Sequence, residues 1–241
     1  VPMFPLRVFA AALLFFHASE FALAYAFHRK TLSRRCEELV LYLSLCTCLL
    51  LPPPLLVLIN RKKKRNTKTK QNAALLFSWP YALAMAAAVV EYLVESTLLS
   101  RWNQSQRSSS PSPPFLVPFS KTATTTAGCL LVLLGEALRK AAMLTAASSF
   151  THDLAWKRVR EHRLVTTGVY SWMRHPGYAG FALWAVGTQV LLRNPLCAIA
   201  FALVVSRFMR VRVEAEEALL VGFFGVEYER YAKRVRRWWW W

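Results

Sequence analysis

The chain has 241 residues, of which 55% are hydrophobic, and it carries a formal net charge of +18 at pH 7. Its apolar residues gather in runs near or above the roughly 20 residues that cross a bilayer, which predicts an integral membrane protein and argues against a soluble one. Lysine and arginine lie between these runs, as the positive-inside rule expects, so the charge does not indicate nucleic-acid binding. The five cysteines show no zinc spacing and lie mostly in apolar runs, which favours buried reduced thiols over a disulfide framework.

The first predicted element is a membrane helix over residues 6–27. It has no small-residue cleavage site, so we interpret it as a retained span and not as a signal peptide. The helix carries His17 and Glu20, and an ionisable residue within a span is a functional candidate. For Glu20 we favour the simpler interpretation, in which the carboxylate faces other helices and is hydrogen-bonded there.

Residues 39–59 are long enough to span, but the LPPPLL sequence at 51–56 removes three successive backbone donors. Basic segments flank this run on both sides, so it cannot cross the membrane if both flanks are cytosolic. We favour a re-entrant or interfacial segment slightly over a crossing helix. The basic run at 61–70 is interpreted as a solvated cytosolic anchor near anionic lipid.

The next predicted helix covers residues 73–99, with Glu91 and Glu95 one turn apart on one face. Its alanine-rich face suits close contact with another helix. Residues 102–118, rich in serine, proline and glutamine, predict a loop without order of its own.

A long helix is predicted over residues 122–150, with Glu136, Arg139 and Lys140 in its middle. Three charges at that depth must pair with one another or line a polar cavity. A pair between Glu136 and Lys140, four residues apart, would leave Arg139 free to face a substrate.

After a polar loop at 151–174 come two short apolar segments, 176–192 and 195–210. The turn at 193–195 is so short that the two must form an antiparallel helical hairpin. The loop before the hairpin and the tail after it therefore lie on the same side of the membrane, and the basic tail predicts that this side is the cytosol. The four tryptophans at 238–241 could be an interfacial anchor or a peculiarity of this sequence.

The polar loop and the tail carry the chemistry-bearing residues. On a helix continuing from Pro195, Arg212 and Glu216 are one turn apart and share a face. They could form a weak surface ion pair. Because the hairpin returns them to the height of residues 174–178, we favour a functional site. No GxG turn occurs, so a Rossmann-type nucleotide domain is not expected.

An ordered series of motifs resembles the isoprenylcysteine carboxyl methyltransferase family over about the last hundred residues. The matching segments are GEALRKAAM (135–143), SF-TH (149–152), HRLVTTGVYSWMRHPGYAG (162–180), GTQVLLRNPLC (187–197), RFMRVRVEAEE (207–217) and FFGVEYERYAKRV (223–235). The RHPGYAG segment alone is also similar to phospholipid methyltransferases and sterol reductases, so the whole series carries the resemblance.

The resemblance implies an all-α integral membrane protein with five or six transmembrane helices, a C-terminal helical hairpin, and a cytosolic cofactor-binding loop and tail. Residues 1–150 would be N-terminal membrane helices, with a variable insertion at 31–72, and residues 151–241 the catalytic region. The implied location is the endoplasmic reticulum membrane, with the active site facing the cytosol.

The implied reaction transfers a methyl group from S-adenosylmethionine to the C-terminal carboxylate of a farnesylated or geranylgeranylated cysteine. The substrates would be processed CaaX proteins of the small GTPase type. A carboxylate with a pKa of about 3.5 is ionised at neutral pH, so no general base is required.

The family's functional positions can be carried onto this chain residue by residue. The implied cofactor contacts are His162, Arg163, Leu164, Val165, Tyr170, His175, Pro176, Gly177, Tyr178 and Glu216. Arg212 takes the substrate-binding and catalytic role, and Arg139 is a second candidate near the substrate carboxylate. A polar cofactor contact that is usual about seven residues before His162 is replaced by Ala155.

Two other functions fit parts of the pattern. A phospholipid N-methyltransferase would share RHPGYAG and the glutamate, but an amine nucleophile would have little use for Arg139 and Arg212. A non-catalytic membrane scaffold would bind anionic lipid through its basic loops, but it would leave the arrangement of His175, Tyr178 and Glu216 without a purpose.

Overall fold

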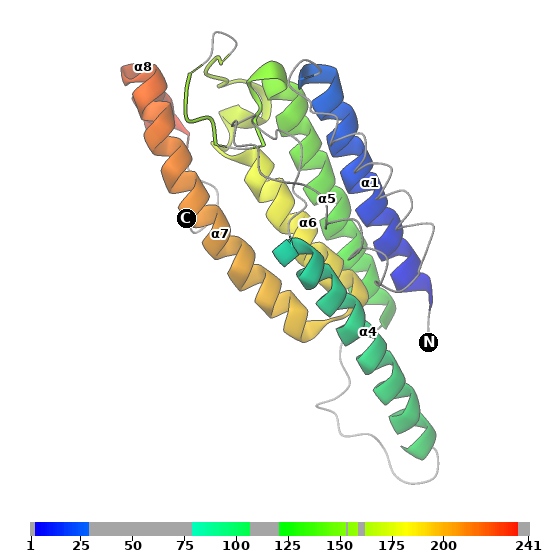
Figure 1. The fold of residues 1–241 in the computed structure, drawn as a ribbon. Helices are drawn as coiled ribbons and strands as arrows, with labels where there is room; N and C mark the ends of the chain where they lie inside the picture. Colours follow the sequence, from blue (N-terminus) through cyan, green and yellow to red (C-terminus); the bar gives the residue numbers. More distant parts are fainter. Residues whose placement is uncertain (1–2, 29–78, 107–120, 153, 159–161, 236–241) are drawn as a thin grey trace, which may run out of the picture.

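The computed structural model describes residues 3–28, 79–106, 121–152, 154–158 and 162–235, and every regular element in these ranges is helical (Figure 1). The helices are α1 (Met3–His28), α4 (Trp79–Gln106), α5 (Lys121–Ala146), α6 (Pro176–Leu192), α7 (Pro195–Phe224) and α8 (Val226–Arg234), with 3-10 turns at Ala147–Ser149 and Gly168–Ser171. The predicted all-α class is confirmed for this part of the chain. The segment 39–59, the basic run 61–70, three of the cysteines and the terminal tryptophans lie outside the described residues.

The centre of the bundle is the pair α5 and α6, with α1 packed beside them (Figure 1). Glycines allow the two backbones to approach closely. A Cβ atom on Gly135 would lie 2.7 Å from the Gly180 carbonyl oxygen, and a Cβ on Gly180 would lie 2.7 Å from the Gly135 carbonyl oxygen. The contact therefore has no room for a side chain at either position.

An aromatic cluster fills the space between α1 and α6. Phe16 of α1 is fully buried and stacks on Trp184 of α6 with ring centroids 4.2 Å apart.

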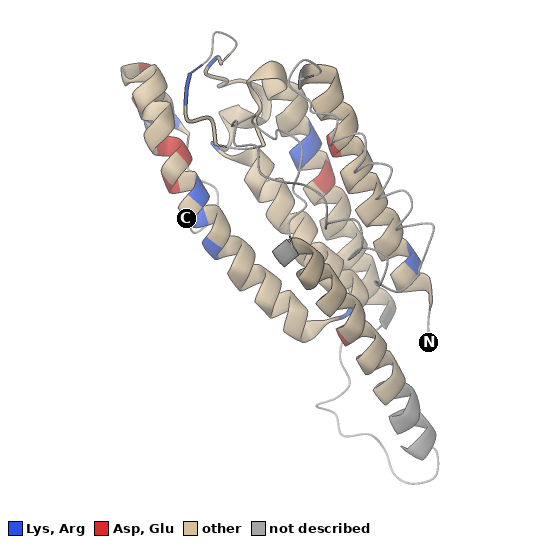
Figure 2. Cartoon of the chain, viewed as in Figure 1, with Lys and Arg blue, Asp and Glu red and all other residues tan. Residues whose placement is uncertain are grey.

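Many long apolar side chains on α1, α4, α5 and α7 point outward from the bundle. Two of the described helical stretches, 3–27 and 81–98, are long and apolar enough to cross a membrane by length and composition. Figure 2 shows that charged positions interrupt α5 and the C-terminal half of α7.

The predicted hairpin is confirmed, because α6 and α7 run antiparallel and only Arg193 and Asn194 join them (Figure 1). Arg193 adopts a left-handed conformation with φ of 65°, and its N–H donates to the Val190 carbonyl. At the start of α7, the Glu91 carboxylate of α4 accepts hydrogen bonds from the N–H groups of Leu196 and Cys197 at 2.9 and 2.8 Å. An acceptor from another helix thus caps α7.

The ends of the helices predicted over residues 73–99 and 122–150 differ from the structure. The α4 helix continues to Gln106, into the predicted loop, because no proline or glycine interrupts the chain before Pro111. The α5 helix ends at Ala146 and not at residue 150, since Ala147 has a positive φ of 47° and begins a 3-10 turn. Ser149 in that turn uses its side chain to accept the N–H of Arg163 at 3.1 Å, which ties the polar loop to the end of α5.

Candidate active site

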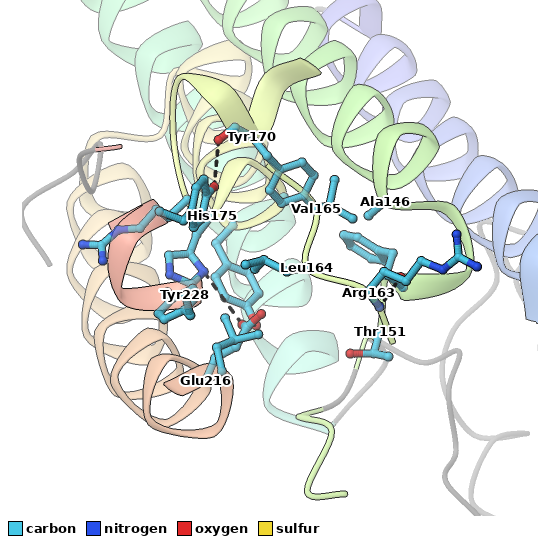
Figure 3. A pocket seen from close by; sticks show the side chains of 16 residues that line it. Ala146, Thr151, Arg163, Leu164, Val165, Tyr170, His175, Glu216 and Tyr228 are labelled. Carbon is cyan, nitrogen blue, oxygen red and sulfur yellow. Dashed lines mark hydrogen bonds and ion pairs between the residues drawn. The ribbon is translucent and has the colours of Figure 1, made fainter. Parts of the chain in front are cut away.

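A pocket lies where the end of α5, the polar loop, the start of α6 and the C-terminal part of α7 meet α8 (Figure 3). It is lined by Ala146, Ser149, Phe150, Thr151, Arg163, Leu164, Val165, Tyr170, Arg174, His175, Gly177, Tyr178, Glu216, Leu220, Tyr228 and Tyr231. The hairpin brings α7 back to the loop, so these residues come together although the loop and α8 are about sixty positions apart. The end of α5 and the residues that follow it contribute too, through Ala146, Ser149 and Phe150.

Eight of the ten residues assigned to the cofactor line this pocket. They are Arg163, Leu164, Val165, Tyr170, His175, Gly177, Tyr178 and Glu216. The other two lie beside it: Pro176 is buried as the first residue of α6, and the His162 ring lies 6.4 Å from the Phe223 ring. Ala155, which stands where the resemblance implies a polar cofactor contact, is not among the lining residues.

A hydrogen-bonded group joins α6 to α7 on the inner side of the pocket. The Tyr178 hydroxyl donates to Glu216 Oε2 and accepts a hydrogen bond from Arg212 Nε at 2.9 Å. His175 stacks on the Tyr178 ring at 5.7 Å, and its Nδ1 lies 3.9 Å from Glu216 Oε2. Arg212 and Glu216 are thus connected through the Tyr178 hydroxyl.

Glu217 is a buried carboxylate that sequence reasoning did not single out. Its Oε1 lies 3.2 Å from Arg174 Nη1 and 3.1 Å from His175 Nε2. These two contacts hold the loop residues before α6 against α7. The adjacent glutamates of RVEAEE were a signal for this role, because neighbours on a helix point about 100° apart and can serve two partners.

The short helix α8 closes the far side of the pocket. Its buried residues Tyr228 and Tyr231 pack with Leu164 and Leu220, and the Tyr231 hydroxyl donates to the Tyr170 carbonyl at 2.7 Å. Burial raises the pKa of Tyr231 to about 12, and it also raises the pKa of Tyr170 and of Tyr228. The phenols therefore stay neutral hydrogen-bond donors at physiological pH. Spacing of three residues in EYERY was the sequence signal for this shared face.

The polar loop is also fastened to the end of α7. Arg158 donates from Nη1 to the Phe223 carbonyl at 2.6 Å, and its guanidinium lies 4.7 Å from the centre of the Phe224 ring. A cation at the last carbonyls of a helix is favourable because of the helix dipole. The contact keeps the loop next to the turn at Gly225, whose φ of 52° separates α7 from α8.

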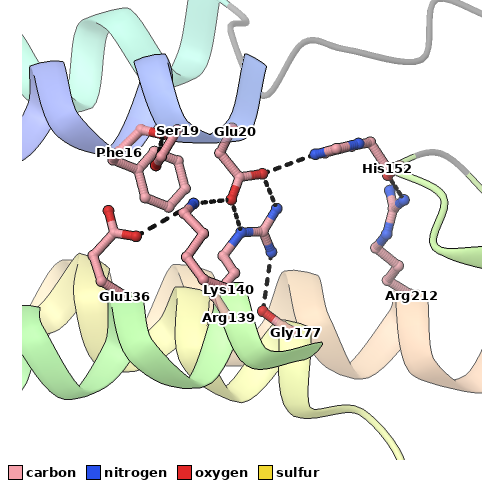
Figure 4. Close-up of polar contacts among 9 residues, drawn as sticks. All are labelled: Phe16, Ser19, Glu20, Glu136, Arg139, Lys140, His152, Gly177 and Arg212. Carbon is pink, nitrogen blue, oxygen red and sulfur yellow. Dashed lines mark hydrogen bonds and ion pairs between the residues drawn. The ribbon is translucent and has the colours of Figure 1, made fainter. Parts of the chain in front are cut away.

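Glu20 forms a second polar centre between α1 and α5 (Figure 4). Its carboxylate accepts hydrogen bonds from Arg139 Nε and Nη2 at 2.8 and 2.9 Å, and it also contacts Lys140. The predicted interhelical role of Glu20 is confirmed, and so is the pair between Glu136 and Lys140, with 3.3 Å between Oε2 and Nζ.

The expectation that Arg139 is free is wrong. Its side chain is 4% exposed, and its Nη1 donates to the Gly177 carbonyl at 3.0 Å in addition to the bonds with Glu20. The reason is that α1 supplies a carboxylate to α5, a partner that the local sequence around Arg139 does not reveal. Arg139 therefore contacts the backbone of the pocket residue Gly177 but is not itself among the lining residues.

Comparisons with known proteins agree with this architecture. The model of the isoprenylcysteine carboxyl methyltransferase (ICMT) family matches residues 127–222. Protein-S-isoprenylcysteine O-methyltransferase B of Arabidopsis thaliana is 45% identical over 163 residues, which cover 68% of this chain and 75% of the relative. Protein-S-isoprenylcysteine O-methyltransferase of Homo sapiens is 54% identical over 108 residues, which cover 45% of this chain and 38% of the relative.

A solved structure also superposes on nearly the whole chain. It is described as the eukaryotic intramembrane Ras methyltransferase ICMT, and it matches with a TM-score of 0.70 and 26% identity over 98% of this chain and 66% of that one.

Proposed function

The chain belongs to the isoprenylcysteine carboxyl methyltransferase family, whose members are integral membrane enzymes, and we propose that it methylates the C-terminal carboxylate of prenylated cysteine with S-adenosylmethionine as donor. The observation that carries the proposal is the contact of Arg212 with Tyr178. This contact supports the proposal because a permanently charged guanidinium, which can bind a carboxylate, touches Tyr178 in the wall of a pocket that contains Glu216.

The pocket residues suit the proposed donor. Glu216 offers a carboxylate for ribose hydroxyls, and the aromatic rings offer flat apolar faces for an adenine and a π-surface for a cation. Within the described residues, the buried Tyr228 hydroxyl has no hydrogen-bond partner, as expected for a group that serves a ligand. When bound, S-adenosylmethionine supplies an electrophilic methyl group on a sulfonium.

The proposed cofactor set keeps all ten assigned residues with two kinds of role. Those that line the pocket contact the donor, whereas His162 and Pro176 shape the loop and the start of α6. Glu217 and Tyr231 join them as supports, because they hold His175 and Tyr170 in place.

Arg212 binds the substrate carboxylate in this proposal. The carboxylate is already ionised, so the protein has to orient it and remove water from it, and effects of this kind lower a barrier by several kcal/mol. A guanidinium holds a carboxylate through parallel donors without accepting its proton. Arg212 therefore positions the nucleophile and does not activate it.

Arg139, the second candidate, supports the same site through a hydrogen bond to its backbone. It holds the Gly177 carbonyl between the two pocket residues His175 and Tyr178, so it fixes the backbone that presents both side chains. Its charge is neutralised by Glu20, which leaves the stronger electrostatic pull on the substrate to Arg212.

The substrate class explains why the site belongs in a membrane. Each buried methylene of a prenyl chain contributes about 0.8 kcal/mol of membrane affinity, so a prenylated CaaX protein concentrates at the bilayer. We propose that the prenyl group enters between the helices from the lipid, and that the donor enters from the cytosol at the end of the bundle where α8 lies. The endoplasmic reticulum is the proposed membrane, and proteins of the small GTPase type are the proposed substrates.

The test is an incubation of membranes containing the protein with radiolabelled S-adenosylmethionine and N-acetyl-S-farnesylcysteine, followed by counting of base-labile methyl ester. Label is expected with this acceptor and not with its carboxamide or an unprenylated cysteine. Base-stable label in lipid extracts without ester would replace the proposal with phospholipid N-methylation. No label at all, in folded protein, would favour the scaffold.

A further inference from the structure

A series of polar contacts joins the first helix to the proposed substrate arginine (Figure 4). Glu20 on α1 contacts His152 Nε2 through its Oε2 at 2.8 Å. The backbone carbonyl of His152 in turn accepts a hydrogen bond from Arg212 Nη2. His152 thus contacts both Glu20 and Arg212.

The described residues just before His152 have no regular secondary structure to hold it. The 3-10 turn ends at Ser149, and Phe150 is already extended with ψ of 127°. The position of the His152 carbonyl therefore depends on its side chain, which is 6% exposed. The imidazole is fixed by the carboxylate of Glu20 and by an edge contact with the Phe150 ring at 5.3 Å.

The hydrogen bond to the His152 carbonyl helps to set the orientation of the Arg212 guanidinium. Arg212 donates from Nε to the Tyr178 hydroxyl and from Nη2 to the His152 carbonyl, so its guanidinium is held at two points. Among the contacts of the described residues, Nη1 makes no hydrogen bond. A planar guanidinium anchored at two donors has a fixed plane, and its remaining donor points in a fixed direction.

We propose that Glu20 and His152 are positioning residues for recognition of the acceptor carboxylate. Glu20 fixes the His152 imidazole, and the His152 carbonyl fixes the plane of Arg212, so the first membrane helix sets the affinity for the acceptor but not for the methyl donor. This inference rests on the proposed role of Arg212 in binding the prenylcysteine carboxylate.

His152 is the better position for a test, because a change at Glu20 would also remove the partner of Arg139 and Lys140. His152→Leu removes the contact with Glu20 and leaves those ion pairs in place. His152→Gln keeps a donor at the position of Nε2. The matched control is His17→Leu, because His17 lies on α1 one turn before Glu20 and contacts the Tyr81 hydroxyl at 2.9 Å, away from Arg212.

The full-length protein in membranes is assayed for KM and kcat with N-acetyl-S-farnesylcysteine, and donor affinity is measured separately by equilibrium binding of S-adenosylmethionine. We expect His152→Leu to raise KM for the acceptor by about tenfold, as for loss of a hydrogen bond to a charged group, with donor affinity changed less than about twofold. His152→Gln is expected to restore most of the acceptor affinity, and His17→Leu to leave it unchanged.

A variant of Arg212 shows whether His152 acts through that residue. In an Arg212→Lys background the Nη2 contact is absent, so His152→Leu should add less than about twofold to the acceptor KM. An unchanged acceptor KM in His152→Leu, or an equal loss of donor affinity, would overturn the inference while the wild-type activity stands. Failure of the wild type to methylate the acceptor would instead overturn the proposed function, and the inference with it.

Discussion

Tyr178 of α6 and Arg212 of α7 are joined by a hydrogen bond of 2.9 Å, which Arg212 Nε donates to the tyrosine hydroxyl. The same hydroxyl donates to Glu216, so it connects the proposed acceptor ligand to the proposed donor pocket. A single oxygen atom thus contacts both the proposed acceptor residue and a residue of the proposed donor pocket.

Replacement of Tyr178 by phenylalanine should impair the use of both substrates. The variant loses hydrogen bonds to two charged groups, and we expect kcat/KM to fall about tenfold to a hundredfold for the donor and for the acceptor alike. Steady-state kinetics with each substrate varied in turn measures this. Tyr81→Phe, which removes a hydroxyl that contacts His17 on α1, is the control. A loss confined to one substrate would show that the hydroxyl does not connect the two.

Replacement of Arg212 should impair the reaction if it removes the positive charge, and also if it keeps the charge but removes the planar guanidinium. Arg212→Ala is expected to lower kcat/KM for the prenylcysteine by at least about a hundredfold, and Arg212→Lys to restore only part of it because lysine lacks the planar fork. Equilibrium binding of S-adenosylmethionine should change little in either variant. Normal ester formation by Arg212→Ala would contradict the assignment.

Glu217 should matter for stability more than its neighbour Glu214. Glu217→Gln leaves Arg174 and His175 beside an uncharged amide, and loss of one partner of a buried pair costs about 3 kcal/mol or more. The melting temperature of the detergent-solubilised protein should fall accordingly. Glu214→Gln, on the exposed face of the same helix, should melt like the wild type. Equal melting temperatures for the two variants would refute this role.

A methyl group at Gly180 should destabilise the contact between α5 and α6. Its Cβ would lie within 2.8 Å of three atoms of α5, two of them backbone, so Gly180→Ala must separate the helices at a cost of about 1–3 kcal/mol. Yield and melting temperature after purification measure the effect. Gly222→Ala on α7 is the matched control, because a Cβ there would meet nothing within 4 Å beyond its own stretch of helix. A Gly180→Ala protein as stable as the control would mean that the two helices can shift freely.

High pH should destabilise the pocket through Tyr231. Burial raises the pKa of its phenol from 10.0 to about 12, so the folded state retains the proton more strongly than the unfolded state. The resulting stabilisation is complete below about pH 10 and disappears as the pH rises through about 12. Melting temperatures across this interval should fall more steeply for the wild type than for Tyr231→Phe. Parallel curves would exclude a contribution from this phenol.

The sequence predicts best those features that depend on local spacing. The short turn at Arg193 and Asn194 predicts the hairpin, and the four-residue spacing of Arg212 and Glu216 predicts their shared face. A carboxylate within a predicted membrane helix likewise predicts that Glu20 needs a partner. The identity of this partner is not predictable from the sequence, because the arginine that pairs with Glu20 is 119 residues away. Periodicity specifies which face of a helix is buried but not which helix packs against it.

Features that depend on tertiary contacts could not be predicted in the same way. Glu217 and Glu216 are adjacent in the chain and chemically identical, and only the position of α6 decides which of them meets Arg174. The capping of α7 by Glu91 similarly requires α4 to be in place, so the pair of glutamates on α4 indicates a polar face but not the N–H groups that use it.

The pairing of Glu20 with Arg139 and Lys140 has a consequence for how the protein is made. The ribosome delivers α1 to the membrane long before α5, because synthesis proceeds from the N-terminus. When α5 enters the bilayer with two adjacent cations, a buried carboxylate that can neutralise them is already there. The order of the helices along the chain thus supplies the counter-ion ahead of the charges that need it.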